Sequence, residues 1–123
     1  MKEGYEGRYY GTDINPNAGY LLNGIYKNVG EILYGDSIES LKKLDVKIDL
    51  FINDSDHSPE YEYQEYIVIK NKLSPKAIIL GDNSNYTDKL FKFSIENNRN
   101  FLFFQEVPKN HWYPGAGIGI SFI

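Results

Sequence analysis

Segments that favour strands alternate with amphipathic segments along most of this chain. The expected strands have the length and composition of single β-strands and occur at 8–14, 31–34, 48–52 and 77–80. Between them, apolar residues recur at helical spacing, which predicts helices at about 16–29, 37–44, 59–72 and 87–95. Strands that alternate with helices are typical of a parallel sheet built from βαβ units.

In the last third of the chain, strands no longer alternate with helices. Two strands are expected at 101–106 and 117–123, and the segment between them is a loop rich in proline and aromatic residues. Consecutive strands without a helix between them predict an antiparallel hairpin at one edge of the sheet. His111 and Trp112 lie in this loop, where an aromatic turn over the hydrophobic core is favoured over a wall of a ligand pocket. The fold class is therefore α/β, in a single domain over 1–123.

Composition narrows the possible functions. The chain has 123 residues, of which 15% are aromatic, and this share fits a globular domain. A formal net charge of -4 gives no broad basic surface, so no nucleic-acid partner is expected. The absence of cysteine excludes disulfides and thiolate metal sites. No apolar run approaches the roughly 20 residues of a membrane span, and the N-terminus lacks a signal peptide, so a cytoplasmic protein is expected.

Four successive expected strands each end on an acidic residue, namely Asp13, Asp36, Asp54 and Asp82. In a parallel sheet the carboxyl ends of all strands lie on one edge, which is where open α/β sheets bind ligands. Any one such aspartate is more often a helix cap or a turn former. Four of them would repel one another unless they met donors such as hydroxyl groups, amines or a metal ion.

The densest group of polar residues follows the strand at 48–52. It consists of Asn53, Asp54, Ser55, Asp56 and His57. Ser58 and Pro59 come next, and this pair is typical of a helix N-terminus. A strand that ends in carboxylates and turns directly into a helix marks a candidate binding site.

The chain resembles the class I S-adenosylmethionine-dependent methyltransferases. Within them it is most similar to the small O-methyltransferases that include the catechol and caffeoyl-CoA types and the cephalosporin-hydroxylase-like group. The resemblance covers nearly the whole chain and rests on five segments in the family's order: YGTDINP at 10–16, YGDSIESL at 34–41, DLFINDSDHSPEY at 49–61, LSPKAIILGDN at 73–83 and GAGIGISFI at 115–123. It implies a Rossmann-like sheet, mostly parallel, with an antiparallel C-terminal hairpin.

The resemblance also implies a cofactor site. Asp13 would accept hydrogen bonds from the ribose hydroxyls of S-adenosylmethionine, with Ile14 and Asn15 against the sugar and adenine. Asp36 would meet the adenine amino group, with Ser37 beside it. Further along the chain, Asp54 would lie next to the methionine end of the cofactor.

A metal site and a mechanism follow from the same resemblance. Asp54, Asp82 and Asn83 match the residues that hold a divalent cation in the catechol-type enzymes, and oxygen ligands of this kind suit Mg²⁺, Mn²⁺ or Ca²⁺. The metal would orient the hydroxyl of a small-molecule methyl acceptor for direct transfer. His57 is the candidate general base or substrate contact, and a polar residue in a strand-to-helix turn is an equally weighted alternative.

One diagnostic element of the family is absent from the sequence. The family's first strand ends in a glycine-rich turn beside the methionine portion of the cofactor, and only seven residues precede the segment that matches the second strand. The missing strand would leave two unpaired inner edges. We therefore expect a truncated domain that binds cofactor poorly. It would be completed by a longer protein, by a homo-oligomer that pairs strands across the gap, or by a rearranged sheet.

Two other functions remain open. The chain is alternatively a non-catalytic methyltransferase-like remnant that acts as an interaction module. A domain that binds NAD or a phosphorylated ligand is the weakest reading, because the sequence has no glycine-rich phosphate loop.

Overall fold

The computed structural model describes residues 6–82 and 84–123. The chain forms two compact units, of which the first ends at Lys43 and the second runs over Leu44–Ile123. The expectation of one domain over 1–123 stays a prediction. No helix among the described residues is long and apolar enough to cross a membrane.

The first unit holds a small parallel sheet. Its elements are β1 (Tyr9–Asp13), the 3₁₀ helix η1 (Gly24–Asn28), β2 (Gly30–Tyr34) and α1 (Ser37–Lys43). The two strands pair in parallel, with Tyr9 opposite Gly30 and Asp13 opposite Tyr34. This pairing places the carboxyl ends of both strands on the same edge, as the sequence predicts.

The helix expected at 16–29 does not form as an α-helix. Turns and the short η1 occupy this segment instead. Gly19 has a φ of 75° and Gly24 a φ of 55°, and such left-handed backbone angles interrupt a right-handed helix. The apolar spacing of this segment was therefore a misleading signal, because it did not account for the two glycines.

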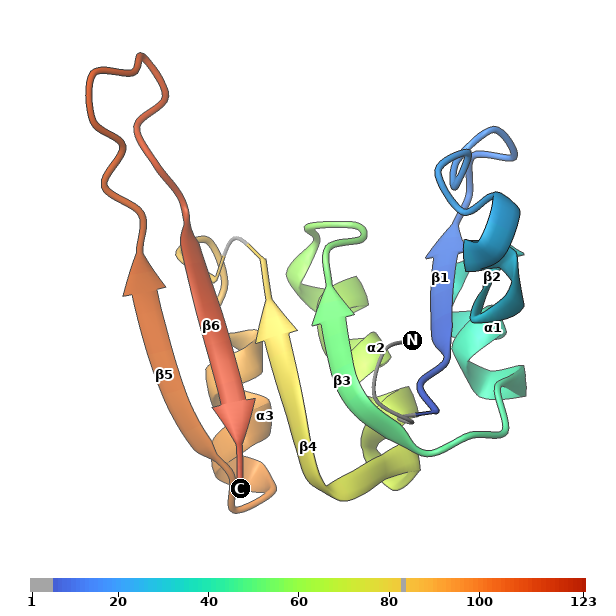
Figure 1. The fold of residues 1–123 in the computed structure, drawn as a ribbon. Helices are drawn as coiled ribbons and strands as arrows, with labels where there is room; N and C mark the ends of the chain where they lie inside the picture. The colour runs from blue at the N-terminus through green and yellow to red at the C-terminus, as the bar shows by residue number, and fades with distance from the viewer. Residues whose placement is uncertain (1–5, 83) are drawn as a thin grey trace. The chain divides into compact units, whose positions relative to one another are not determined.

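The second unit holds a four-stranded sheet in the order β3-β4-β6-β5 (Figure 1). Its elements are β3 (Ile48–Asn53), α2 (Pro59–Ile69), η2 (Lys70–Lys72), β4 (Leu73–Gly81), α3 (Lys89–Glu96), β5 (Asn100–Gln105) and β6 (Gly117–Phe122). β3 and β4 run in parallel, whereas β6 is antiparallel to both β4 and β5. The predicted C-terminal hairpin is thus confirmed, with β5 at the edge of the sheet.

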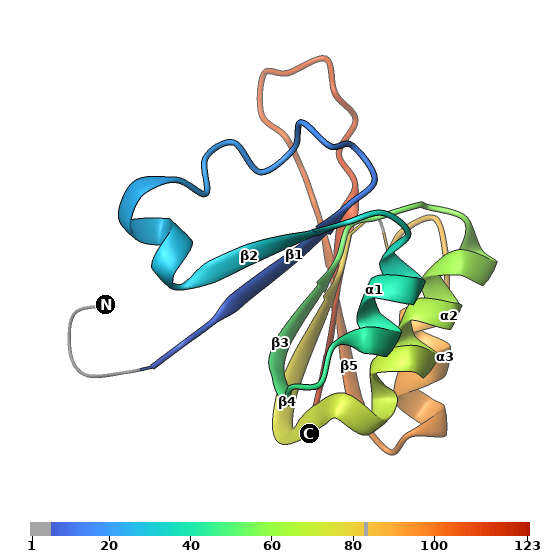
Figure 2. The same cartoon turned by 90° about the vertical axis from the view of Figure 1, so that its right-hand side faces the viewer.

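One face of this sheet packs against α2 and α3, which lie together on the same side (Figure 2). Phe51, Ile79, Ser121 and Phe101 occupy neighbouring positions across the strands on this face. The ring of Tyr66 on α2 lies 6.4 Å from that of Phe51 and 5.5 Å from that of Phe93. The buried core of the unit lies in this layer.

The opposite face of the sheet is apolar and is not covered by α2 or α3. Ile52, Leu80, Ile120 and Leu102 form a row of paired positions across it. Ile52 is 60% exposed and Leu102 is 50% exposed. Parallel strands are ordinarily buried on both faces, so this surface is unusual for β3 and β4.

Each sheet also has an unpaired edge within the described part of the chain. β1 pairs with β2 alone, and β3 pairs with β4 alone. The expectation that the domain is truncated stays a prediction.

Candidate active site

Two aspartates of the second unit meet at the carboxyl ends of neighbouring strands. Asp54 follows β3 and Asp82 follows β4. Asn53 pairs with Gly81 in the parallel register, and the backbone N–H of Asp82 donates a 2.9 Å hydrogen bond to the carbonyl of Asn53. The strand pairing itself thus brings the two carboxylates together.

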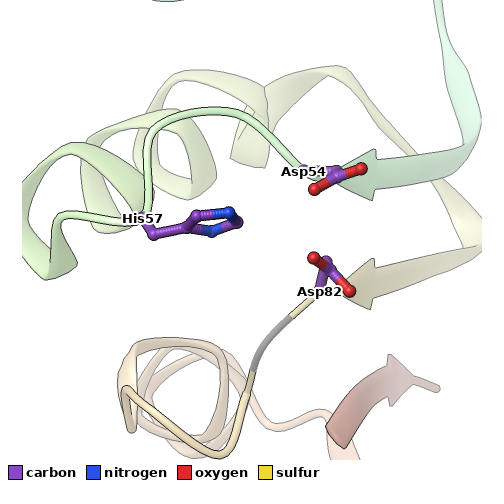
Figure 3. A group of neighbouring side chains, drawn as sticks. All are labelled: Asp54, His57 and Asp82. Atoms are coloured by element: carbon purple, nitrogen blue, oxygen red, sulfur yellow. The ribbon is translucent and has the colours of Figure 1, made fainter. Parts of the chain in front are cut away.

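His57 joins them from the turn that leads into α2. Its imidazole is directed toward the space between the two carboxylates (Figure 3). One ligand atom of each of Asp54, His57 and Asp82 lies within 4.8 Å of the others. The turn is held by Asp56, whose Oδ1 accepts a 2.7 Å hydrogen bond from the backbone N–H of Ser58.

This group, here called the strand-end cluster, can hold a divalent cation. Two ligands bound to Mg²⁺ at about 2.1 Å are separated by at most about 4.2 Å, and two bound to Ca²⁺ at about 2.4 Å by about 4.8 Å. Asp54 and His57 are exposed and Asp82 is half-buried, so small side-chain rotations are enough to close the difference. The imidazole nitrogen adds a ligand that suits Mn²⁺ or Fe²⁺ better than Ca²⁺.

The predicted metal ligands are therefore found only in part. The structure brings Asp54 and Asp82 together, and it adds His57, which the sequence analysis treated as a base and not as a ligand. Asn83, the third predicted ligand, lies outside the described residues.

A buried carboxylate lies beneath the cluster. Glu65 on α2 is 2% exposed, and its Oε2 accepts hydrogen bonds from the side-chain amide of Asn53 and, at 2.7 Å, from the hydroxyl of Ser55. Asn53 and Ser55 are the two neighbours of Asp54 in the chain. Sequence reasoning missed Glu65, because glutamate is rarely buried and its burial here depends on how α2 packs against the sheet.

A second buried acid lies one helical turn earlier. Glu62 is also 2% exposed, and its Oε1 accepts a 2.7 Å hydrogen bond from the hydroxyl of Tyr66. Burial raises the pKa of Glu62, although hydrogen bonds from Tyr66 and Thr87 and the charge of His57 oppose this shift. The spacing of Glu62, Glu65 and Tyr66 at i, i+3 and i+4 is a signal that could have placed both acids on one helix face.

The aromatic loop between β5 and β6 carries Tyr113, which lies within electrostatic reach of Asp82 in the strand-end cluster. The connection from β5 to β6 extends beyond the ends of these strands (Figure 1). Partial desolvation raises the pKa of its Tyr113, and the negative charges of Glu106 and Asp82 raise it further. Trp112 is 88% exposed, so the expectation that this loop covers the core is wrong for that residue.

The strand ends of the first unit hold the other predicted residues. Oδ1 of Asp13 accepts a 2.8 Å hydrogen bond from the N–H of Asn15, and the carbonyl of Asp13 accepts one of 2.9 Å from Gly35. Oδ1 of Asp36 accepts a 2.9 Å hydrogen bond from the N–H of Glu39 in the first turn of α1. Asp36 therefore caps this helix.

Three features of this unit fit an adenosine group. Oδ2 of Asp13 accepts no hydrogen bond from the described residues, so it can receive a ribose hydroxyl. The side chain of Ile14 is 82% exposed beside it and offers an apolar surface. Ser37 is buried, at 7% exposure, next to the exposed Asp36. Asp13 and Asp36 follow neighbouring parallel strands, so one ligand can contact both of them.

A hollow of about 520 Å³ in the same unit lies away from these residues. It is lined by β2 and by the preceding segment, including Tyr20, Asn23 and Lys27, and by neither Asp13 nor Asp36. The hollow therefore does not mark the predicted cofactor site.

Comparison with known proteins identifies relatives for this architecture. A family described as a methyltransferase domain matches residues 1–84. An O-methyltransferase from Bacillus cereus in complex with SAH has a similar structure, with a TM-score of 0.64 and 13% identity over 95% of this chain and 63% of the other. The O-methyltransferase TomG from Streptomyces achromogenes in complex with SAM has a TM-score of 0.57 and 12% identity, over 78% of this chain and 50% of the other.

Other activities occur among the similar structures. An rRNA methylase from Streptococcus thermophilus has a TM-score of 0.64 and 14% identity, over 94% of this chain and 72% of the other. This chain thus spans from half to somewhat less than three quarters of the length of these three proteins. Among curated protein sequences, none matches. The chain belongs to a family of methyltransferase domains, and it has the fold of the class I S-adenosylmethionine-dependent methyltransferases.

Proposed function

We propose that this methyltransferase domain methylates a hydroxyl group of a small molecule with the help of a divalent cation. The observation that carries the proposal is the strand-end cluster, in which Asp54, His57 and Asp82 converge at the carboxyl edge of the sheet. The two similar O-methyltransferases, one with SAH and one with SAM, support S-adenosylmethionine as the cofactor. An rRNA methylase shares the fold, but the formal net charge of -4 favours a small acceptor over a polyanionic one.

The residues of the first unit bind the nucleoside part of the cofactor in this proposal. Asp13 accepts hydrogen bonds from the ribose hydroxyls, and Ile14 and Asn15 lie against the sugar and adenine. Asp36 and Ser37 contact the adenine at the neighbouring strand end. The bound cofactor supplies a methyl group on a sulfonium sulfur.

The residues of the second unit bind and activate the acceptor. Asp54 and Asp82 are the carboxylate ligands of the cation, together with Asn83, and Asp54 also lies beside the methionine end of the cofactor. A bound divalent cation lowers the pKa of an acceptor hydroxyl. In this proposal His57 is not a ligand of the cation but the general base that receives the hydroxyl proton, and its imidazole is directed into the space between the two carboxylates.

A second candidate function is supported by a different observation. The sequence contains no glycine-rich turn of the family type, and β1 and β3 each have an unpaired edge within the described residues. These features favour a non-catalytic remnant that binds a partner through its sheet, with weak affinity for S-adenosylmethionine. Completion of the sheet by a second copy of the chain remains part of this alternative.

Titration calorimetry with Mn²⁺ and with S-adenosylmethionine tests these two functions. We expect Mn²⁺ to bind, and Asp82→Asn to weaken this binding by about tenfold because one carboxylate ligand is lost. Asp45→Asn removes an exposed acid of the same unit and is the matched control.

The outcomes separate the candidates. Cofactor binding that strengthens with Mn²⁺ supports the methyltransferase. Binding of neither by a folded chain would favour the interaction module. Equal Mn²⁺ affinities for Asp82→Asn and the unmodified chain would contradict the proposed metal site.

A further inference from the structure

Glu65 connects both strand ends of the candidate active site, although its carboxylate does not reach the solvent. Its Oε2 accepts hydrogen bonds from the side chains of Asn53 and Ser55, which flank Asp54 in the chain. The carbonyl of Asn53 in turn accepts the N–H of Asp82 at 2.9 Å. A single buried group on α2 is thus bonded to the side chains of both neighbours of Asp54, and one of these neighbours, Asn53, is also bonded through its backbone to Asp82.

A carboxylate side chain is well suited to this place. A carboxylate accepts hydrogen bonds and donates none, so one oxygen can receive both side chains at once. Hydrogen bonds to an ionised group are shorter and roughly twice as strong as those between neutral groups. In a region excluded from water they hold their partners in one arrangement.

Asn53 and Ser55 depend on these hydrogen bonds for a fixed position, because the segment after β3 has no regular structure before α2 begins at Pro59. Asp54 is exposed, and no hydrogen bond is found for its own carboxylate among the described residues. No bond of its own therefore fixes the Asp54 carboxylate, and the backbone sets the region that it can reach. That backbone is held on both sides by the two residues that donate to Glu65.

We propose that Glu65 is a positioning residue, which holds Asp54 in the orientation needed to bind a divalent cation with Asp82. The inference rests on the proposed function for its metal, but the arrangement of the segment 53–57 can be measured without metal. Groups that orient metal ligands typically change metal affinity by 10–100-fold when they are lost.

Glu65→Gln tests this role with two measurements on the full chain. The first is hydrogen exchange of the backbone amides of 54–57 in metal-free protein, which we expect to become about tenfold faster. The second is the affinity for Mn²⁺, which we expect to fall by about tenfold at a temperature where the variant is fully folded. A purely structural residue would lower the melting temperature and leave the Mn²⁺ affinity of the folded protein unchanged.

Glu62→Gln is the matched control. Glu62 has the same 2% exposure on the same helix, but its Oε1 bonds to Tyr66 and not to a neighbour of Asp54. We expect this variant to retain slow exchange at 54–57 and to lose less than about threefold in Mn²⁺ affinity. Should Glu65→Gln fail to fold, Ser55→Ala removes one of the two donors and is expected to weaken Mn²⁺ binding by a few-fold.

Three results are decisive. Unchanged exchange and unchanged affinity in Glu65→Gln would overturn the inference. Equal losses in Glu65→Gln and Glu62→Gln would also overturn it, because buried charge and not positioning would then be responsible. If the unmodified chain binds no Mn²⁺ while Glu65→Gln alone accelerates exchange at 54–57, the metal site fails and the positioning role of Glu65 stands.

Discussion

Burial divides the acidic residues around the second unit's strand ends into two groups. Glu62 and Glu65 are almost completely enclosed on α2, whereas Asp54 is exposed and Asp82 half-buried at the edge of the sheet. The enclosed acids accept hydrogen bonds from Tyr66, Asn53 and Ser55. The outer pair is directed, with His57, toward a common point. The buried acids therefore bond to other side chains of the protein, and the outer acids lie at the edge of the sheet where we propose that a ligand binds.

The raised pKa of Glu62 makes stability depend on pH. Burial is its main cause, opposed by Tyr66, Thr87 and the charge of His57, and assisted by the charge of Glu65. A raised pKa in the folded state stabilises the fold below the ordinary value of 4.5, and this contribution is lost as the pH rises through the folded pKa. Glu62→Gln, which stays neutral, should gain stability relative to the unmodified chain as the pH rises from about 4.5 to about 7.5.

Urea unfolding at several pH values measures this difference. Lys92→Met, which removes an exposed charge on α3, controls for a general effect of net charge. A stability difference that is the same at both ends of this pH range would contradict the assigned cause.

Among the elements, the C-terminal hairpin is joined to β4 by strand pairing and also by one buried side chain. Nε of Arg99 donates a 2.9 Å hydrogen bond to the hydroxyl of Ser121, and its Nη2 donates to the carbonyls of Ala77 and Ser121. Arg99 is 8% exposed, and burial lowers its pKa. It precedes β5 and bonds to both β4 and β6, so it links all three strands at one end of the sheet.

Replacement of Arg99 should weaken this connection strongly. We expect Arg99→Met to lower the free energy of unfolding by about 2–4 kcal/mol, because buried acceptors on two strands lose their donor. Lys92→Met removes an exposed ion pair of 3.9 Å with Glu96 and a contact of its Nζ, 5.1 Å from the centre of the Tyr63 ring, and should cost less than about 1 kcal/mol. Chemical denaturation measures the free energy of unfolding of both variants. Similar small losses in the two would show that Arg99 does not join the strands.

At the scale of the molecule, the four-stranded sheet has one face covered by helices and one apolar face without them. Ile79 points into the covered face and is fully buried, whereas Ile52, on the neighbouring strand, is 60% exposed on the other. The comparison of these two isoleucines shows how unequal the two faces are. A face of this kind is expected to favour association or the binding of apolar probes.

Matched substitutions measure whether this face is open in solution. We expect Ile79→Thr to lower the free energy of unfolding by about 2–4 kcal/mol, through lost packing and a buried hydroxyl. Ile52→Thr should cost less than about 1 kcal/mol, because its side chain already contacts water. A cost for Ile52→Thr close to that for Ile79→Thr would mean that another part of the protein, or a second copy, covers the face.

Much of the fold was predictable from local patterns. The strands expected at 48–52, 101–106 and 117–123 appear within one residue of these positions, because each is a short apolar segment bounded by turn residues. The strand expected at 77–80 forms only part of β4, which begins four residues earlier at Leu73. The prediction of a helix at 16–29 was wrong, because apolar spacing contains no information about the backbone angles of Gly19 and Gly24. The hairpin followed from the absence of a helical segment between two strands.

The candidate site was predictable only in its outer residues. Asp54 and Asp82 could be paired from the sequence, because parallel neighbouring strands end on the same edge. The contribution of His57 to the same point depends on the path of the turn before α2, which no local pattern specifies. Glu62 and Glu65 were missed because their burial depends on how α2 packs against the sheet.

The sequence by itself determined the order of strands and helices and the acids at the strand ends, since periodicity and turn residues act over a few positions. Only the tertiary structure decided that Asp54, His57 and Asp82 converge and that Glu65 is enclosed next to them. These properties depend on contacts between residues far apart in the chain. Burial and direction arise when the elements pack, and the chemistry of the site depends on both.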